Sequence, residues 1–143
     1  MTLEEIHENW EKDSNIDATE LGSESLKIPK IHHKYYVMYD KEKLKLKAMV
    51  ENHKSLKLEK YEFYTIGPNE DTPKDWRLPP RGMVLKSDVP MYMDADKQII
   101  ESNLKISYQQ EKVDTLEAII KSILNRNFII KNAIDWNKFT SGG

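Results

Sequence analysis

The spacing of apolar residues predicts that most of this chain is helical. Leu3, Ile6 and Trp10 recur on one helical face, and Thr2 and Glu5 form the capping box T-x-x-E in front of them. We therefore expect a short helix that ends near residue 13.

A second helical stretch is expected to follow, with Asp17 as its candidate N-cap. Gly22 and Pro29 interrupt this stretch. Pro29 either opens a new helix in its first turn or kinks a continuous one.

Residues 30–64 contain neither glycine nor proline and are expected to be helical. Their apolar residues form a partial stripe at three- and four-residue spacing. The stripe is interrupted near Glu42 and Lys45.

Residues 65–82 hold four of the six prolines in the chain, which predicts a loop. Trp76 and Leu78 are expected to anchor part of this loop to the body of the protein. After the loop, residues 83–85 and 89–93 are expected to be short extended segments.

Asp94 and Asp96 are expected to open a long C-terminal helix, with a helix stop at residues 125–127 and a last apolar element after it. From Val113 onward the apolar spacing is that of a packing seam. We expect this seam to join subunits, through Val113, Leu116, Ile120, Ile123, Leu124 and Trp136.

Composition favours long exposed helices over a single compact core. Apolar residues make up 38% of the 143 residues and charged residues 32%, against the usual ~45–50% and ~25%. Some apolar surface is therefore expected to be buried between subunits. The absence of cysteine fits a reducing cytoplasm. The acidic start lacks the apolar segment of a secretory signal, and no run of ~18 apolar residues predicts a membrane span.

The net charge of −2 conceals a strong asymmetry. Residues 1–26 carry eight acidic residues and one lysine, whereas residues 27–60 carry ten lysines and four acidic residues. We call residues 27–60 the basic block. A concentrated basic segment in a near-neutral chain indicates a site where a polyanion binds.

Tyrosines and a phenylalanine are interleaved with the basic block or follow it, and flat rings next to cations suit the stacked bases and phosphates of a single strand. The candidate DNA-binding residues are Lys47, Lys54, Lys57, Lys60, Tyr61 and Tyr64. Positions 57, 60, 61 and 64 share one helical face. Lysine dominates over arginine, so bidentate base reading is not indicated and binding should be weakly sequence-specific. A solvated lysine face with core tyrosines remains the alternative.

No pattern for catalysis, a metal or a cofactor stands out. His32, His33 and His53 lack partner carboxylates at ligand spacing, and the chain contains no G-x-S-x-G, H-E-x-x-H or P-loop sequence. We therefore expect a non-enzymatic protein without catalytic residues, metal or cofactor.

Three stretches resemble the UvsY family of bacteriophage recombination mediator proteins. They are LEEIHENWEKDSNIDATEL (3–21), GMVLKSDVPMYMDADKQI (82–99) and VDTLEAIIKSILNRNFIIKNAIDWNKFTSG (113–142), and NRNFIIKNAIDW in the third is the most specific. The resemblance runs through nearly the whole chain in order.

The residue patterns predict a mainly α chain of elongated helices with a small extended or β segment around residues 83–93. The resemblance implies a helical protein that assembles as a ring of six or seven subunits. It implies one domain over 1–143, with an N-terminal basic DNA-binding part (1–64), a variable loop (65–82) and C-terminal oligomerisation helices (83–143).

The function implied by the resemblance is DNA recombination and repair in the cytoplasm of an infected bacterial host. Family members bind single-stranded DNA, contact the phage single-strand-binding protein and a phage RecA-like recombinase, and promote loading of that recombinase. They are not enzymes and need no cofactor.

The family's basic DNA-binding pair has the pattern K-x-R-x-[DE]-aromatic-Tyr, which residues 58–64 resemble. Lys60 takes the second basic position, but Leu58 takes the first, and Lys57 lies about 100° away on a helix.

Two other classes of protein remain open. One is a helical structural or scaffolding protein that binds only other proteins. A weaker one is a membrane-surface protein, although the basic block lacks a strong amphipathic pattern.

Overall fold

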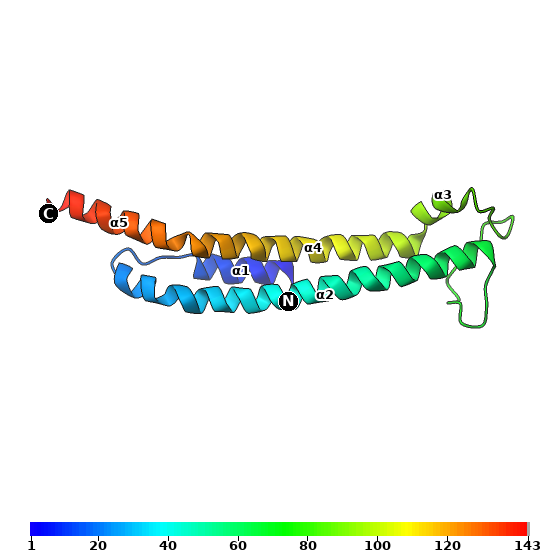
Figure 1. The fold of residues 1–143 in the computed structure, drawn as a ribbon, viewed down its shortest axis with the longest axis horizontal. Helices are drawn as coiled ribbons and strands as arrows, with labels where there is room; N and C mark the ends of the chain where they lie inside the picture. Colours follow the sequence, from blue (N-terminus) through cyan, green and yellow to red (C-terminus); the bar gives the residue numbers. More distant parts are fainter. Residues whose placement is uncertain (143) are drawn as a thin grey trace. The chain divides into compact units, whose positions relative to one another are not determined.

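The structure is a computed structural model that describes residues 1–142, and within them the chain is helical with no strand (Figure 1). The helices are α1 (Leu3–Asp13), α2 (Leu21–Thr65), α3 (Val89–Asp94), α4 (Lys97–Leu124) and α5 (Arg126–Thr140). The prediction of a mainly α chain is confirmed. The helices form two compact units, one of residues 1–44 with 109–142 and one of residues 45–108, which we call the first and second units.

The core of the first unit collects side chains from α1, α2, α4 and α5, and Figure 1 shows α1 lying alongside the α2–α4 pair in this unit. Ile6, Tyr35, Leu116 and Ile123 have no exposed surface. Trp10 meets Tyr35 edge-on, with ring centroids 5.5 Å apart. The apolar stripe of α1 is thus buried as its spacing predicts.

The start of α1 confirms the predicted capping box. The Thr2 Oγ1 accepts from the Glu5 N–H at 3.1 Å, and the Thr2 N–H donates to Glu5 Oε2 at 2.9 Å. Asp17 was expected to cap the next helix, and that prediction is wrong. Its carboxylate instead accepts from the N–H and hydroxyl of Thr19, which closes a turn before α2 begins at Leu21.

Gly22 and Pro29 lie inside α2, so the predicted interruption is wrong and Pro29 does not open a new helix. An interior proline costs a helix ~3 kcal/mol because it removes one hydrogen bond and crowds the preceding turn. Ile28 and Ile31 flank Pro29 and pack into the core of the first unit. Their burial supports the helical conformation on both sides of the proline.

The break in the apolar stripe at Glu42 is a buried polar contact rather than an exposed face. Glu42 is 3% exposed. Its Oε2 accepts from Gln109 Nε2 at 2.6 Å and lies 3.4 Å from Lys112 Nζ. The charge of Glu42 is compensated inside the first unit, which is the condition for burying a carboxylate.

The second unit has its own core of Phe63, Tyr64 and Val89. Trp76 and Leu78 pack against this core, so the prediction that they anchor the loop is confirmed. The Val84 N–H also donates to the Tyr64 carbonyl at 2.8 Å.

The expected extended segments at 83–93 are wrong. Residues 83–88 form turns and coil, and α3 is helical. Pro90 lies in the first turn of α3, where the N–H that proline lacks would have had no partner within the helix.

Gly67 ends α2. Its N–H donates to the carbonyls of Glu62 and Phe63, and its φ of +106° lies in the left-handed region that favours glycine. The chain can therefore turn sharply into the loop.

The two predicted boundaries of the C-terminal helix are largely confirmed. Asp96 caps α4, because its Oδ1 accepts from the Ile99 N–H at 2.9 Å. Asp94 is instead the last residue of α3. The predicted stop near residue 125 separates α4 from α5 at Asn125, although both sides are helical.

Candidate nucleic-acid interface

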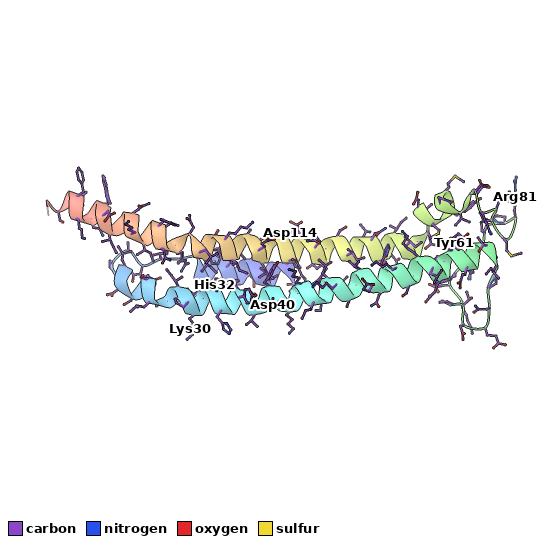
Figure 2. The ribbon with its side chains drawn as sticks, in the orientation of Figure 1. Lys30, His32, Asp40, Tyr61, Arg81 and Asp114 are labelled. Atoms are coloured by element: carbon purple, nitrogen blue, oxygen red, sulfur yellow. The ribbon has the colours of Figure 1, made fainter. Side chains whose placement is uncertain are left out.

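The exposed basic face of the second unit follows one side of α2. Lys47, Val50, Lys54, Lys57 and Tyr61 repeat at spacings of three and four residues, so they form one stripe along the helix. All five are exposed, Tyr61 by 39%, and Figure 2 marks Tyr61 on α2. We call these residues the lysine face.

The ammonium groups of this face are available to an anion. Lys54 Nζ lies 3.1 Å from Glu51 Oε1, but both side chains are about two-thirds exposed, and such surface pairs contribute only ~0–1 kcal/mol. In the part of the chain that the structure describes, neither Lys47 nor Lys57 makes an ion pair. A phosphate can thus replace water at these groups without breaking a strong contact.

Lys60 lies inside the second unit rather than on the lysine face. It is 1% exposed. Its Nζ lies 3.0 Å from Asp96 Oδ2, donates to Gln98 Oε1 at 2.6 Å, and sits 3.8 Å from the ring centroid of Trp76. With these partners, the ammonium has no room for a phosphate in this conformation.

Tyr64 lies beside Lys60 in the same cluster. It is 6% exposed, and its hydroxyl donates to Asp96 Oδ2 at 2.6 Å. Burial raises the pKa of Tyr64 far above its usual value of 10.0, and the hydrogen bond to the negative Asp96 raises it further. Tyr64 therefore stays neutral, and its ring is not presented to a base.

Asp96 links the members of this cluster. Burial by itself raises the pKa of the Asp96 carboxyl, but hydrogen bonds from Tyr64, the Ile99 N–H and Lys60 outweigh burial, and the net pKa lies below 3.8. The Asp96 carboxylate stays charged and holds α2 and α4 together within the second unit.

The six predicted DNA-binding residues are therefore divided by the structure. Lys47, Lys54, Lys57 and Tyr61 lie at the surface, whereas Lys60 and Tyr64 are buried. Positions 57, 60, 61 and 64 share one face of α2, but 57 and 61 point to solvent whereas 60 and 64 point into the core. Helical spacing alone does not predict which pair is buried. Asp96, whose carboxylate pairs with the buried Lys60 and Tyr64, lies more than thirty residues further along the chain.

Two of the five basic-block lysines in the first unit pair with carboxylates of the acidic N-terminal segment. Lys34 Nζ lies 2.6 Å from Asp13 Oδ2, and Lys27 Nζ lies 3.1 Å from Glu24 Oε1. Lys30 remains exposed and is labelled in Figure 2. The acidic N-terminal segment thus offsets part of the basic block here, which sequence charge counting did not detect.

Some residues of the predicted subunit seam are buried within the chain and others are exposed. Val113, Leu116 and Ile123 are buried in the described chain, and Ile120 packs against the core of the first unit. Leu124 is 58% exposed and Trp136 63%. Phe128 and Phe139, which the sequence places with Trp136 in a stripe expected to be core or to meet another subunit, are also exposed, and so is Ile129.

These outward residues lie on α5, apart from Leu124 at the end of α4, and we call them the α5 face: Leu124, Phe128, Ile129, Trp136 and Phe139. Trp136 and Phe139 stack on each other with centroids 5.8 Å apart. Figure 1 shows the last turns of α5 running past the start of α2. Exposed apolar residues gathered on one helix indicate an interaction surface.

Two further features of the chain bear on the class of site. Among residues 1–142, no three His, Cys, Asp or Glu side chains are grouped as a metal site would require. No helix in that range is both long and apolar enough to span a bilayer.

Together, these features define a helical binding protein with an exposed cationic face and a separate apolar face. The family model for "Recombination, repair and ssDNA binding protein UvsY" matches residues 9–143, and the chain belongs to this family. The predicted family resemblance is thereby confirmed.

Solved structures show the same fold. The chain is similar to the crystal structure of the Bacteriophage T4 recombination mediator protein UvsY in lattice type II, with a TM-score of 0.80 and 22% identity over 99% of this chain and 98% of that chain. For lattice type IV the TM-score is 0.80, with 20% identity over 98% and 99% of the two chains. No curated protein matches the chain.

Proposed function

We propose that this protein binds single-stranded DNA with little sequence specificity and promotes loading of a phage RecA-like recombinase onto DNA covered by the phage single-strand-binding protein. It acts in the cytoplasm of the infected bacterial host, without catalysis or a cofactor. Membership of a family of recombination, repair and single-strand DNA-binding proteins supports this proposal.

The lysine face is the observation that supports the proposed binding of single-stranded DNA. Lys47, Lys54 and Lys57 are exposed in one row with Tyr61, which supplies cations along a backbone and a ring beside it. Lysine binds phosphate as a point charge and does not read base edges bidentately. The DNA contact is therefore assigned to these four residues, while Lys60 and Tyr64 support the helix that presents them.

Assembly would increase the strength of this modest surface. The α5 face offers Leu124, Trp136 and Phe139 to a second copy of the chain, and a closed ring of six or seven copies would bury this face in every subunit. Each copy adds one lysine face, so weak phosphate contacts combine into avidity for a long strand. A wrapped strand would then be displaced from the single-strand-binding protein and presented to the recombinase.

Fluorescence anisotropy of labelled oligo-dT at several salt concentrations tests the DNA site. The variant Lys47→Gln/Lys57→Gln removes two charges and breaks no ion pair seen in residues 1–142. Its affinity should fall, and the slope of log K against log salt should flatten by roughly 0.7 for each phosphate that is no longer neutralised. Lys97→Gln/Lys105→Gln removes two exposed charges from α4 and should leave the slope near that of the parent. If both variants gave the same slope of log K against log salt, the lysine face would not be the DNA-binding site.

Sedimentation velocity tests the assembly. Trp136→Ser/Phe139→Ser should yield smaller species, because it places hydroxyls in the α5 face. Leu26→Ser, a change at an 84% exposed apolar residue of α2, should leave the species unchanged. An intact assembly in the double variant would locate the subunit contact elsewhere.

Recombinase loading is tested by the lag in recombinase ATP hydrolysis on DNA precoated with the single-strand-binding protein. The parent protein should shorten the lag, and Lys47→Gln/Lys57→Gln should shorten it less. A lag unaffected by the parent protein would refute the loading function even if DNA binding holds.

A further inference from the structure

A hollow of about 340 Å³ lies between the last turns of α2 and the loop that follows, entirely within the second unit. Phe63 and Trp76 line its aromatic side, and Pro68 and Pro73 line the loop side. Its carboxylates come from Glu59, Glu62 and Asp71.

The walls of this hollow are held in place by the chain itself. The Asp71 N–H donates to Asn69 Oδ1 at 2.8 Å, and the Asn69 N–H donates to Thr72 Oγ1 at 2.9 Å. Trp76 meets Phe63 edge-on with centroids 5.4 Å apart. The site is therefore largely preformed, which lowers the cost of ordering it around a ligand.

The charge of the hollow favours a cation. Glu59, Glu62 and Asp71 are exposed, and none of them makes an ion pair in residues 1–142. The nearby ammonium of Lys60 is neutralised by Asp96 at 3.0 Å. Lys74 and Arg77 line the adjoining hollow on the same loop, so three carboxylates face two cationic side chains and the net charge around the site is negative.

The hollow faces away from the lysine face. At about 100° per residue, Glu62 lies roughly 100° and Glu59 roughly 160° around the α2 axis from Tyr61. Carboxylates repel phosphate, so this side of α2 is unsuited to DNA. One helix thus presents a cationic surface and an acidic aromatic hollow on different sides.

We propose that this hollow binds a lysine or arginine side chain from an extended segment of a partner protein. The aliphatic stem would lie against Trp76 at the wall of the hollow, and the charged head would reach Glu59 and Glu62. Ile66, 75% exposed at the edge of the hollow, gives an apolar contact to the residue next to that side chain. A free small cation would leave Ile66 uncovered, which favours a peptide as the occupant.

The fluorescence of Trp76 reports binding in the variant Trp10→Phe/Trp136→Phe, which leaves Trp76 as the one tryptophan. The probe is a short capped peptide with a central arginine, and its control is the same peptide with citrulline, a neutral isostere. The arginine peptide should change the fluorescence saturably and bind about fivefold more tightly than the citrulline peptide.

Matched variants locate the site. Adding Glu59→Gln/Glu62→Gln should abolish the preference for arginine, whereas Glu101→Gln/Glu111→Gln, which removes two exposed carboxylates of α4, should keep it. Equal binding of both peptides, or a preference that survives Glu59→Gln/Glu62→Gln, would overturn the proposal.

The outcome is separate from DNA binding. Glu59→Gln/Glu62→Gln should retain oligo-dT affinity, since it leaves every residue of the lysine face in place. Loss of the arginine preference with oligo-dT binding intact supports the hollow as a protein-binding site. Competition between the arginine peptide and oligo-dT would instead place both ligands on one surface and refute the assignment.

Discussion

Lys57 and Lys60 lie less than one helical turn apart, and the structure predicts opposite consequences for the same change at each. Lys57→Met removes an exposed charge from the lysine face. Lys60→Met keeps an unbranched stem against Phe63 and Trp76 but leaves the buried carboxylate of Asp96 without its ammonium.

The magnitude for Lys60→Met follows from burial. Lys60 and Asp96 are 1% and 3% exposed at their side chains, and removing one partner of such a pair costs about 3–5 kcal/mol. Asp96 retains the hydrogen bonds from Tyr64 and the Ile99 N–H, which places the expected loss near the lower limit. For a chain of this length the change lowers Tm by about 10 °C.

Thermal unfolding followed by circular dichroism measures this loss. Lys57→Met should unfold within a few degrees of the parent, since exposed substitutions usually change stability by only about 0.5 kcal/mol. Lys60→Met/Asp96→Asn should regain part of the stability lost by Lys60→Met, because no unpaired charge stays buried.

Oligo-dT anisotropy below the unfolding range completes the comparison. Lys57→Met should flatten the salt dependence, and Lys60→Met should leave it as in the parent. A Lys60→Met protein with parental stability and a flattened salt dependence would show that the ammonium of Lys60 reaches DNA, and it would refute the division of this helix into a buried and an exposed side.

Three further predictions concern stability and are measured by urea unfolding. The pKa values of Asp13 and Asp96 in the folded protein lie below 3.8. Their contribution to folding stability is therefore present above about pH 3.8 and is lost as the pH falls through the folded pKa values. Asp96→Asn should make stability less sensitive to acid, and an unchanged pH profile would contradict this. Gly67→Ala should cost roughly 1–2 kcal/mol because φ is +106°, whereas Gly22→Ala, in a helix with open space around it, should not destabilise. Thr2→Ala should cost about 1 kcal/mol by removing the N-cap of α1, and Thr140→Ala, near the end of α5, serves as its control.

Local patterns were sufficient for much of the fold. The capping box at Thr2, the cap at Asp96 and the proline-rich loop each depend on residues close together in the chain, so their conformations can be predicted from a few positions. The prediction of an interruption failed at Pro29 because a proline breaks a helix only when packing does not favour a helix on both sides, and here the buried Ile28 and half-buried Ile31 favour it. The extended segment expected at 89–93 is helical instead, because the first turn of a helix tolerates the missing N–H of Pro90.

The sequence alone determined that residues 27–60 are basic, that lysines outnumber arginines there, and that the helices carry apolar stripes. Only the tertiary structure decided which lysines face solvent. Lys60 occupies a core position because Asp96 and Trp76 come from distant segments to compensate its charge, and Glu42 is buried because Gln109 and Lys112 do the same. The physical reason is that a charge can be buried only with its partner, and helical periodicity records the position of a side chain around an axis but not the partner that meets it.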